Sequence, residues 1–206
     1  MARATTKTMI SNMALSSLKV DAVTGIDPPD RNSKAAKLCN RWYDECRREC
    51  LAETVWDFAV ERVTLPSTTA PAFGRYANRF LLPSDFIRIA FIGDEDNPET
   101  DYTIEKGHIL TNLSAPLNLG YVFDQEDIAL FTPKFISLLA ANMARKMAYE
   151  LTGNRSMVAE KETAYTDILS DGKTLDAQQN PPKKVQRSKW KMAKEGLYSA
   201  GGRIVV

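Results

Sequence analysis

The spacing of the apolar residues changes twice along the chain, and this change constrains the fold more than any other feature. Before residue 56 and again after residue 125, apolar residues recur every three or four positions, as in amphipathic helices. Between residues 56 and 125 they alternate with polar residues, as in half-buried strands. We therefore predict an α+β fold that is mainly α: a helical bundle with an inserted small antiparallel β part and an extended basic C-terminal arm.

Four helices are predicted, at about residues 8–20, 33–53, 133–152 and 155–171. The second has the clearest signal, because Asn32 or Ser33 can cap its first turn and its apolar residues form one stripe. That stripe consists of Ala35, Leu38, Cys39, Trp42, Cys46 and Cys50. The fourth helix ends at Asp171-Gly172 or continues to Gln179.

The β-rich segment, residues 56–125, contains several strand signals. Trp56 and Phe58 begin an alternating run, and residues 86–92 are rich in β-branched and aromatic side chains. The Lys-Gly-His sequence at residues 106–108 is expected to be a hairpin turn. Trp42, Trp56 and Phe58 are expected to anchor the core, since large aromatic side chains dominate buried area.

The formal charge of the 206 residues is +1, but it is unevenly distributed. Residues 180–206 carry seven basic residues and one acidic residue, a net charge of +6, whereas residues 1–179 carry 20 basic and 25 acidic residues, a net charge of −5. Pro181 and Pro182 would stop any helix that precedes the basic segment. We therefore divide the chain into a body, residues 1–179, and a basic arm, residues 180–206.

The cellular compartment is expected to be the cytoplasm. No apolar run approaches the roughly 18 to 20 residues that a membrane-spanning helix needs, and polar residues interrupt the start of the chain where a signal peptide would be apolar. The three cysteines, Cys39, Cys46 and Cys50, are an odd number in one short stretch. That pattern favours free thiols in a reducing compartment over a disulfide framework.

The sequence contains no pattern that is typical of a catalytic or metal-binding site. The only histidine, His108, lies beside the predicted turn and far from the cysteines, so neither a hydrolase triad nor a zinc site is expected. The acidic loop that begins at Asp94 lacks the spacing and central glycine of a calcium loop, and we interpret it as a solvated hairpin tip. We therefore predict no enzymatic activity, no cofactor and no metal.

The basic arm is the only segment whose charge suggests a function of its own. It could hold phosphates and stack on the bases of a single strand, dock on an acidic protein surface, or serve as a flexible solubilising tail. The candidate docking residues are Lys183, Lys184, Arg187, Lys189, Trp190, Lys191, Lys194 and Tyr198.

Packing motifs follow one another in a specific order and spacing in two stretches of the body. The first comprises Ala36-Lys-Leu-Cys-Asn-Arg-Trp-Tyr-Asp44, Arg47, Leu51, Trp56-Asp-Phe-Ala59 and Leu65, and the second is Arg79-Phe-Leu-Leu-Pro-Ser-Asp-Phe-Ile-Arg88. Together they resemble the tail tubular protein A family, the head-to-tail adaptors of short-tailed bacteriophages. The resemblance covers most of residues 10–170, and no family role is carried over to the segment after Pro182.

The resemblance implies a structural protein of the virion. Family members form a dodecameric ring between the portal protein and the tail nozzle protein, which is of the tail tubular protein B type. DNA passes through the central channel without sequence-specific binding, and the ring offers attachment surface for tail fibres or tailspikes. Arg79, Asp85 and Arg88 flank the Leu82-Pro83 segment, and we treat them as candidates for ion pairs between subunits.

Our leading hypothesis is therefore a head-to-tail adaptor that is made in the host cytoplasm, has no membrane partner and works by assembly. Because a channel for DNA should not grip the phosphates, we assign the basic arm hypothetically to the portal. The alternative is a nucleic-acid-binding module that acts through this arm.

Overall fold

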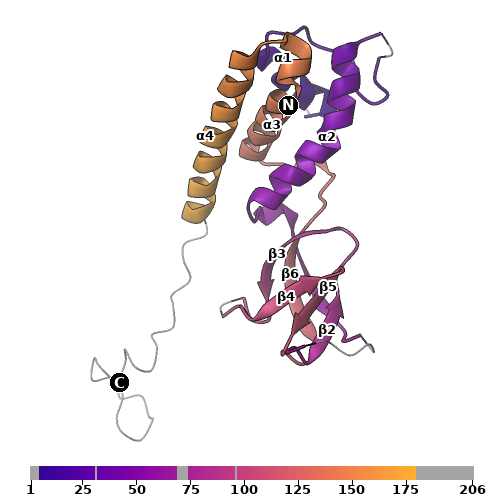
Figure 1. Cartoon of the computed structure of the whole chain (residues 1–206), viewed down its shortest axis with the longest axis vertical. Helices are drawn as coiled ribbons and strands as arrows, with labels where there is room; N and C mark the ends of the chain where they lie inside the picture. The colour runs from indigo at the N-terminus through magenta and orange to yellow at the C-terminus, as the bar shows by residue number, and fades with distance from the viewer. Residues whose placement is uncertain (1–4, 31, 69–73, 96, 180–206) are drawn as a thin grey trace, which may run out of the picture. The chain divides into compact units, whose positions relative to one another are not determined.

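The computed structural model describes residues 5–30, 32–68, 74–95 and 97–179 (Figure 1). The chain divides into two units after Asp176, and the first of them contains nearly all of the described residues. The predicted basic arm, with all of its candidate docking residues, lies outside the described residues. Within them, the first unit combines four α-helices with two three-stranded antiparallel sheets, which is a mixed α+β fold.

The helices are α1 (Lys7–Ser17), α2 (Lys34–Glu53), α3 (Pro133–Thr152) and α4 (Arg155–Gln179). The first three begin at side-chain caps, because an oxygen of Thr6, Ser33 or Thr132 accepts a hydrogen bond from a backbone N–H of the first turn. These caps satisfy N–H groups that have no partner within the helix.

One helix end differs from the predicted one. α1 ends at Ser17 rather than at residue 20, since Lys19 adopts the left-handed conformation with φ of 59°. α4 follows the longer of the two predicted alternatives and continues through Gly172 to Gln179. A glycine inside a helix costs only about 1 kcal/mol relative to alanine, which is too little to stop a helix by itself.

The strands of the predicted antiparallel β part form two sheets. In the first sheet β6 (Leu117–Phe123) lies between β1 (Val60–Leu65) and β3 (Phe86–Ile92). In the second, β5 (His108–Thr111) lies between β2 (Asn78–Leu81) and β4 (Tyr102–Glu105). Apolar residues of both sheets share one core cluster, so each sheet buries the apolar face of the other.

The predicted hairpin is present and joins β4 to β5. Lys106 and Gly107 both have positive φ, of 48° and 73°, as a two-residue turn between antiparallel strands requires. His108, which was predicted to belong to the turn, is the first residue of β5 and pairs with Glu105.

Trp56 and Phe58 do not lie in a strand, contrary to the predicted alternation. Residues Asp57–Ala59 form a short 3-10 helix, and the first strand begins at Val60. Because this turn brings both rings to the same side, each packs against Phe135 of α3, with ring centroids 5.2 Å and 5.1 Å apart. Strand β2, which has four residues, was not predicted from the sequence.

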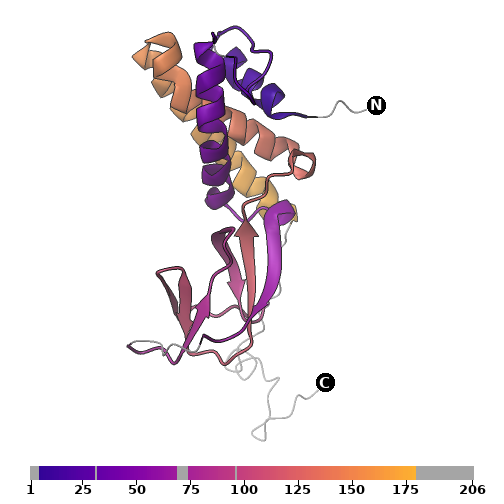
Figure 2. The same cartoon turned by 90° about the vertical axis from the view of Figure 1, so that its right-hand side faces the viewer.

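A second core cluster fills the space between the helices. α3 lies between α2 and α4 in Figure 1, and in Figure 2 α2 passes in front of both. The side chains of Leu139, Met143 and Met147 of α3 are fully buried. α2 buries Tyr43 and Arg47, whereas Trp42 of the predicted stripe is only partly buried. No helix in the described part of the chain is both long and apolar enough to cross a membrane.

Candidate functional site

Arg79, Asp85 and Arg88 lie in three different environments and are not brought together. Nη2 of Arg79, on β2, lies 3.1 Å from Nδ1 of His108. The carboxylate of Asp85, in the turn before β3, accepts a hydrogen bond of 3.2 Å from the hydroxyl of Tyr121. Arg88, on β3, extends to the end of α2. Each of the three therefore has a partner within its own chain.

The C-terminal end of α2 is capped by two side chains from the segment that follows it. Nη1 of Arg88 donates a 2.9 Å hydrogen bond to the carbonyl oxygen of Ala52, and Nε1 of Trp56 donates a 2.9 Å hydrogen bond to that of Cys50. The last carbonyls of a helix have no partner within the helix, and a cation there also interacts favourably with the helix dipole. These contacts fasten the end of α2 to the first sheet.

The buried guanidinium of Arg47 forms a second connection between α2 and the first sheet. The side chain of Arg47 is 2% exposed, and its Nη1 donates a 2.9 Å hydrogen bond to the carbonyl oxygen of Gln125, just after β6. Its Nη2 lies 3.0 Å from the carboxylate of Asp124. The exposed Arg48 donates to the other oxygen of the same carboxylate over 2.8 Å. A buried cation of this kind is stable only because it is paired and hydrogen-bonded.

We call these contacts the α2 joint, and its residues are Arg47, Trp56, Arg88, Asp124 and Gln125. Arg47 and Trp56 come from the first stretch that resembles the adaptor family, and Arg88 comes from the second. The two stretches therefore meet in space at the end of α2.

Two tyrosines beside these contacts have perturbed pKa values. Burial raises the pKa of the Tyr43 hydroxyl to about 12, although the positive charge of Arg47 acts in the opposite direction. Burial also raises the pKa of Tyr121, and the nearby carboxylates of Asp85 and Glu61 raise it further. The Tyr121 hydroxyl lies 3.2 Å from an oxygen of each carboxylate. A single hydroxyl proton can serve only one of them at a time.

A polar network joins the three longer helices. Glu49 of α2 accepts hydrogen bonds from Lys146 over 2.6 Å and from Asn142 over 3.0 Å, both on α3. Although burial has the opposite effect, these hydrogen bonds hold the pKa of Glu49 below its usual value. Arg145 of α3 in turn pairs with Glu162 of α4 over 3.0 Å. The network links α2 to α3 and α3 to α4.

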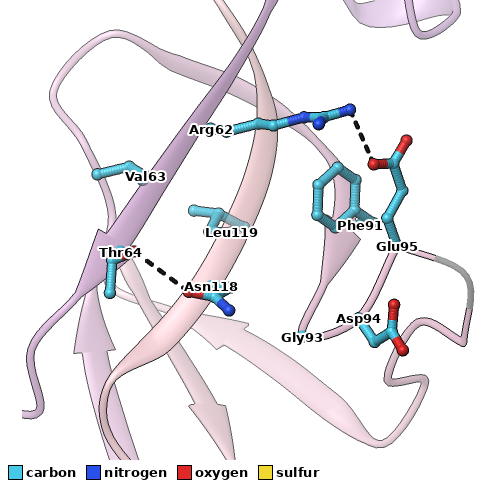
Figure 3. Close-up of a pocket in the computed structure, with 9 residues that line it drawn as sticks. All are labelled: Arg62, Val63, Thr64, Phe91, Gly93, Asp94, Glu95, Asn118 and Leu119. Carbon is cyan, nitrogen blue, oxygen red and sulfur yellow. Dashed lines mark hydrogen bonds and ion pairs between the residues drawn. The ribbon is translucent and has the colours of Figure 1, made fainter.

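The outer face of the first sheet carries a shallow groove, shown in Figure 3. The guanidinium of Arg62 lies over the ring of Phe91, 5.6 Å from its centroid, and pairs with Glu95 over 2.8 Å. The Phe91 ring in turn covers Gly120, where a Cβ atom would lie 2.1 Å from Phe91 Cε1. The hydroxyl of Thr64 donates to Oδ1 of Asn118 within the same groove. The Arg62–Glu95 pair and the Phe91 ring thus cover the middle of the sheet.

The three cysteines are free thiols on the buried side of α2, as predicted. Burial raises the pKa of Cys39 to about 11 and that of Cys46 to about 12, and it raises the pKa of Cys50 as well. Thiols of this kind are neutral at pH 7 and are poor nucleophiles and metal ligands. No group of histidine, cysteine, aspartate and glutamate side chains among the described residues is placed to hold a metal ion.

Arg47 is the residue of the joint whose burial the sequence analysis missed. It lies one turn after Tyr43 and one turn before Leu51, both of which are buried, so helical spacing alone places it on the buried face. A charged residue is rarely assigned to the core, because it is almost never fully buried without a partner. The partners, Asp124 and Gln125, are remote in the sequence and could not be identified from it.

Comparisons of the chain with protein-family models and with curated proteins found no match.

Proposed function

We propose that this protein is a subunit of a head-to-tail adaptor ring of a short-tailed bacteriophage. Such a ring joins the portal vertex to the tail nozzle and forms part of the DNA channel. The proposal includes the dodecameric state, the location in the virion, the attachment of tail fibres or tailspikes, and the finer description of the body as a helical bundle with an inserted β part.

The observation that carries the proposal is the α2 joint. The two stretches that resemble the adaptor family are separated in sequence, yet Trp56 and Arg88 both donate to carbonyl oxygens at the end of α2. Arg47 of α2 in turn donates to the carbonyl oxygen of Gln125, just after β6. The order and spacing of the two stretches therefore have a common physical purpose, which is to hold a helical part and a β part in a fixed relation. An adaptor needs this rigidity, since it must present one surface to the portal and another to the nozzle at the same time.

The charge distribution supports the same role. Residues 1–179 have a net charge of −5, and a channel lined by such subunits would not hold DNA through its phosphates. The +6 of residues 180–206 suits attachment to a protein surface of opposite charge, for which we propose the portal. The body and the arm would then have separate tasks, ring formation and docking.

The experiment compares the full chain with a variant that lacks residues 180–206. Both are mixed with purified portal rings of the source phage and are analysed by sedimentation and negative-stain microscopy. The full chain should form rings on the portal. The shortened chain should keep the circular dichroism spectrum of the folded body but fail to attach. Unchanged attachment would discard the role of the arm, and a full chain that never binds the portal would discard the adaptor proposal.

The same samples test the alternative function. A monodisperse monomer that binds single-stranded DNA tightly at low salt, and that has no affinity for portal rings, would favour a nucleic-acid-binding module. In that case log Kd should rise steeply with log salt concentration, with a slope set by the number of phosphates that the arm neutralises.

A further inference from the structure

The solvent-exposed face of α2 is predominantly basic. It carries Lys34, Lys37, Arg41 and Arg48, against two acidic residues, Asp44 and Glu45. Arg41 lies at the centre of this face, opposite the buried Cys39, Tyr43 and Cys46. Within the described residues, neither Lys37 nor Arg41 forms an ion pair with a carboxylate. These two cations are therefore available to a partner.

The solvent-exposed face of α4 has the opposite charge. Glu160 and Asp167 lie along it, with Thr163 between them, and the buried Tyr165 lies on the other side. Lys161, whose side chain is only 13% exposed, pairs with Glu160 over 2.8 Å. Asp167 forms no ion pair among the residues that the structure describes. The outer face of α4 is therefore acidic.

The two charged faces have the same period and lie on opposite flanks of the helical part. Lys34, Arg41 and Arg48 are spaced by seven residues, as are Glu160 and Asp167. Seven residues are two helical turns, or about 10.5 Å. α2 and α4 flank α3 on its two sides in Figure 1.

The two helices also run in the same direction, because each is antiparallel to α3. Lys34, at the start of α2, donates to the carbonyl oxygen of Glu150 near the end of α3, while the carbonyl oxygen of Cys46, further along α2, accepts from Asn142 near the middle of α3. On the other side, Lys134 at the start of α3 pairs with Asp171 of α4. A second copy related by a rotation about an axis roughly parallel to the helices would therefore bring its α4 alongside α2 in a parallel arrangement.

We propose that the basic face of α2 in one copy packs against the acidic face of α4 in the next copy. The partner that binds the basic face of α2 is a second copy of this chain, because this chain carries both complementary faces. The charged residues of the two faces have the same spacing, and the two helices run in the same direction. The contact is heterologous, since α2 against α2 or α4 against α4 would place like charges together. Heterologous contacts generate a ring when the rotation closes. This inference rests on the proposed function and names the surfaces that would form the ring.

Charge reversal tests the pairing on the full chain. Arg41→Glu and Asp167→Arg are each expected to weaken subunit association by about fivefold to tenfold per contact, because an exposed attraction becomes a repulsion. The double variant Arg41→Glu with Asp167→Arg should assemble again. An equimolar mixture of the two single variants should also assemble, as a ring in which the variants alternate.

Mass photometry and negative-stain images measure assembly, and circular dichroism verifies that each variant is folded. Lys106→Glu and Glu105→Arg, both exposed on the β4–β5 hairpin, are the matched controls for the charge change and should assemble like the wild type. Single reversals that assemble normally would overturn the pairing, and so would a double variant and a mixture that both remain monomeric. A wild-type chain that stays monomeric up to its solubility limit would overturn it too.

The outcome separates this inference from the proposed function. Rings that depend on Arg41 and Asp167 but never bind a portal would keep the pairing and reject the adaptor role. Rings that bind the portal and tolerate both reversals would keep the adaptor role and reject the pairing.

Discussion

Replacing Arg47 by methionine should destabilise the protein far more than the same replacement at Arg48, although both side chains bind Asp124. The side chain of Arg47 is 2% exposed and that of Arg48 is 61% exposed. Loss of Arg47 leaves the carbonyl oxygen of Gln125 without its donor and removes the buried partner of a carboxylate that is only 16% exposed. Breaking a buried pair from one side costs about 3 to 5 kcal/mol, whereas an exposed pair contributes about 0 to 1 kcal/mol.

Thermal and urea unfolding of the two variants measures this difference. For a domain of this size, 1 kcal/mol shifts Tm by about 2 to 4 °C, so Arg47→Met should lower Tm by about 10 °C and Arg48→Met by less than about 4 °C. Adding Asp124→Asn to Arg47→Met should recover part of the loss, because it removes the charge that was left unpaired. Equal losses at Arg47 and Arg48, or no recovery in the double variant, would refute the view that burial decides the strength of the joint.

Three other variants or conditions test the remaining contacts. Trp56→Ala should lower the free energy of unfolding by about 3 to 5 kcal/mol, because it empties a buried site. Trp56→Phe should lower it by about 1 kcal/mol, because only the hydrogen bond to the carbonyl oxygen of Cys50 is lost. Equal losses in urea unfolding would contradict the role of Trp56 as a cap of α2. Gly120→Ala should destabilise the first sheet, since the new Cβ atom would lie 2.1 Å from Phe91 Cε1. Phe91→Ala should relieve that effect in a double-mutant cycle. Additive losses of stability would contradict the contact between Phe91 and residue 120. The three cysteines should react with a thiol reagent only after unfolding, and the free energy of unfolding should fall as the pH rises from about 9, where unfolded thiols ionise, towards the folded pKa of about 11 for Cys39. Fast labelling of the native protein at pH 8, or stability that is flat over this range, would contradict neutral buried thiols.

The α+β class and most element positions could be read from the sequence, because they depend on neighbours within a few residues. The caps at Ser33 and Thr132 bond to N–H groups three residues ahead, and the Lys106-Gly107 turn is set by its own backbone. The reading failed at Trp56 and Phe58, whose alternation suggested a strand. Their rings are held on one side by Phe135, which is remote in the sequence.

The candidates for the subunit interface show the same difference between features that depend on near neighbours and features that depend on residues remote in the sequence. Arg88 was selected as a charged residue within a motif, and the sequence held no sign that its guanidinium donates to the carbonyl oxygen of Ala52, 36 residues earlier, in the last turn of α2. The contact of Arg47 with Gln125 spans 78 residues. Hydrogen bonds of this range depend on which elements pack together, and no local pattern records that.

The sequence by itself determined the period of each segment, the starts of the helices, the hairpin and the buried position of the thiols, since propensity, capping and amphipathicity act over one or two turns. Only the tertiary structure decided that the strands form two sheets, that Arg47 is buried and that the motifs of residues 36–65 and 79–88 meet at the end of α2. The physical reason is that a buried charge or a free helix end must find its partner wherever the packed chain brings one within hydrogen-bond distance.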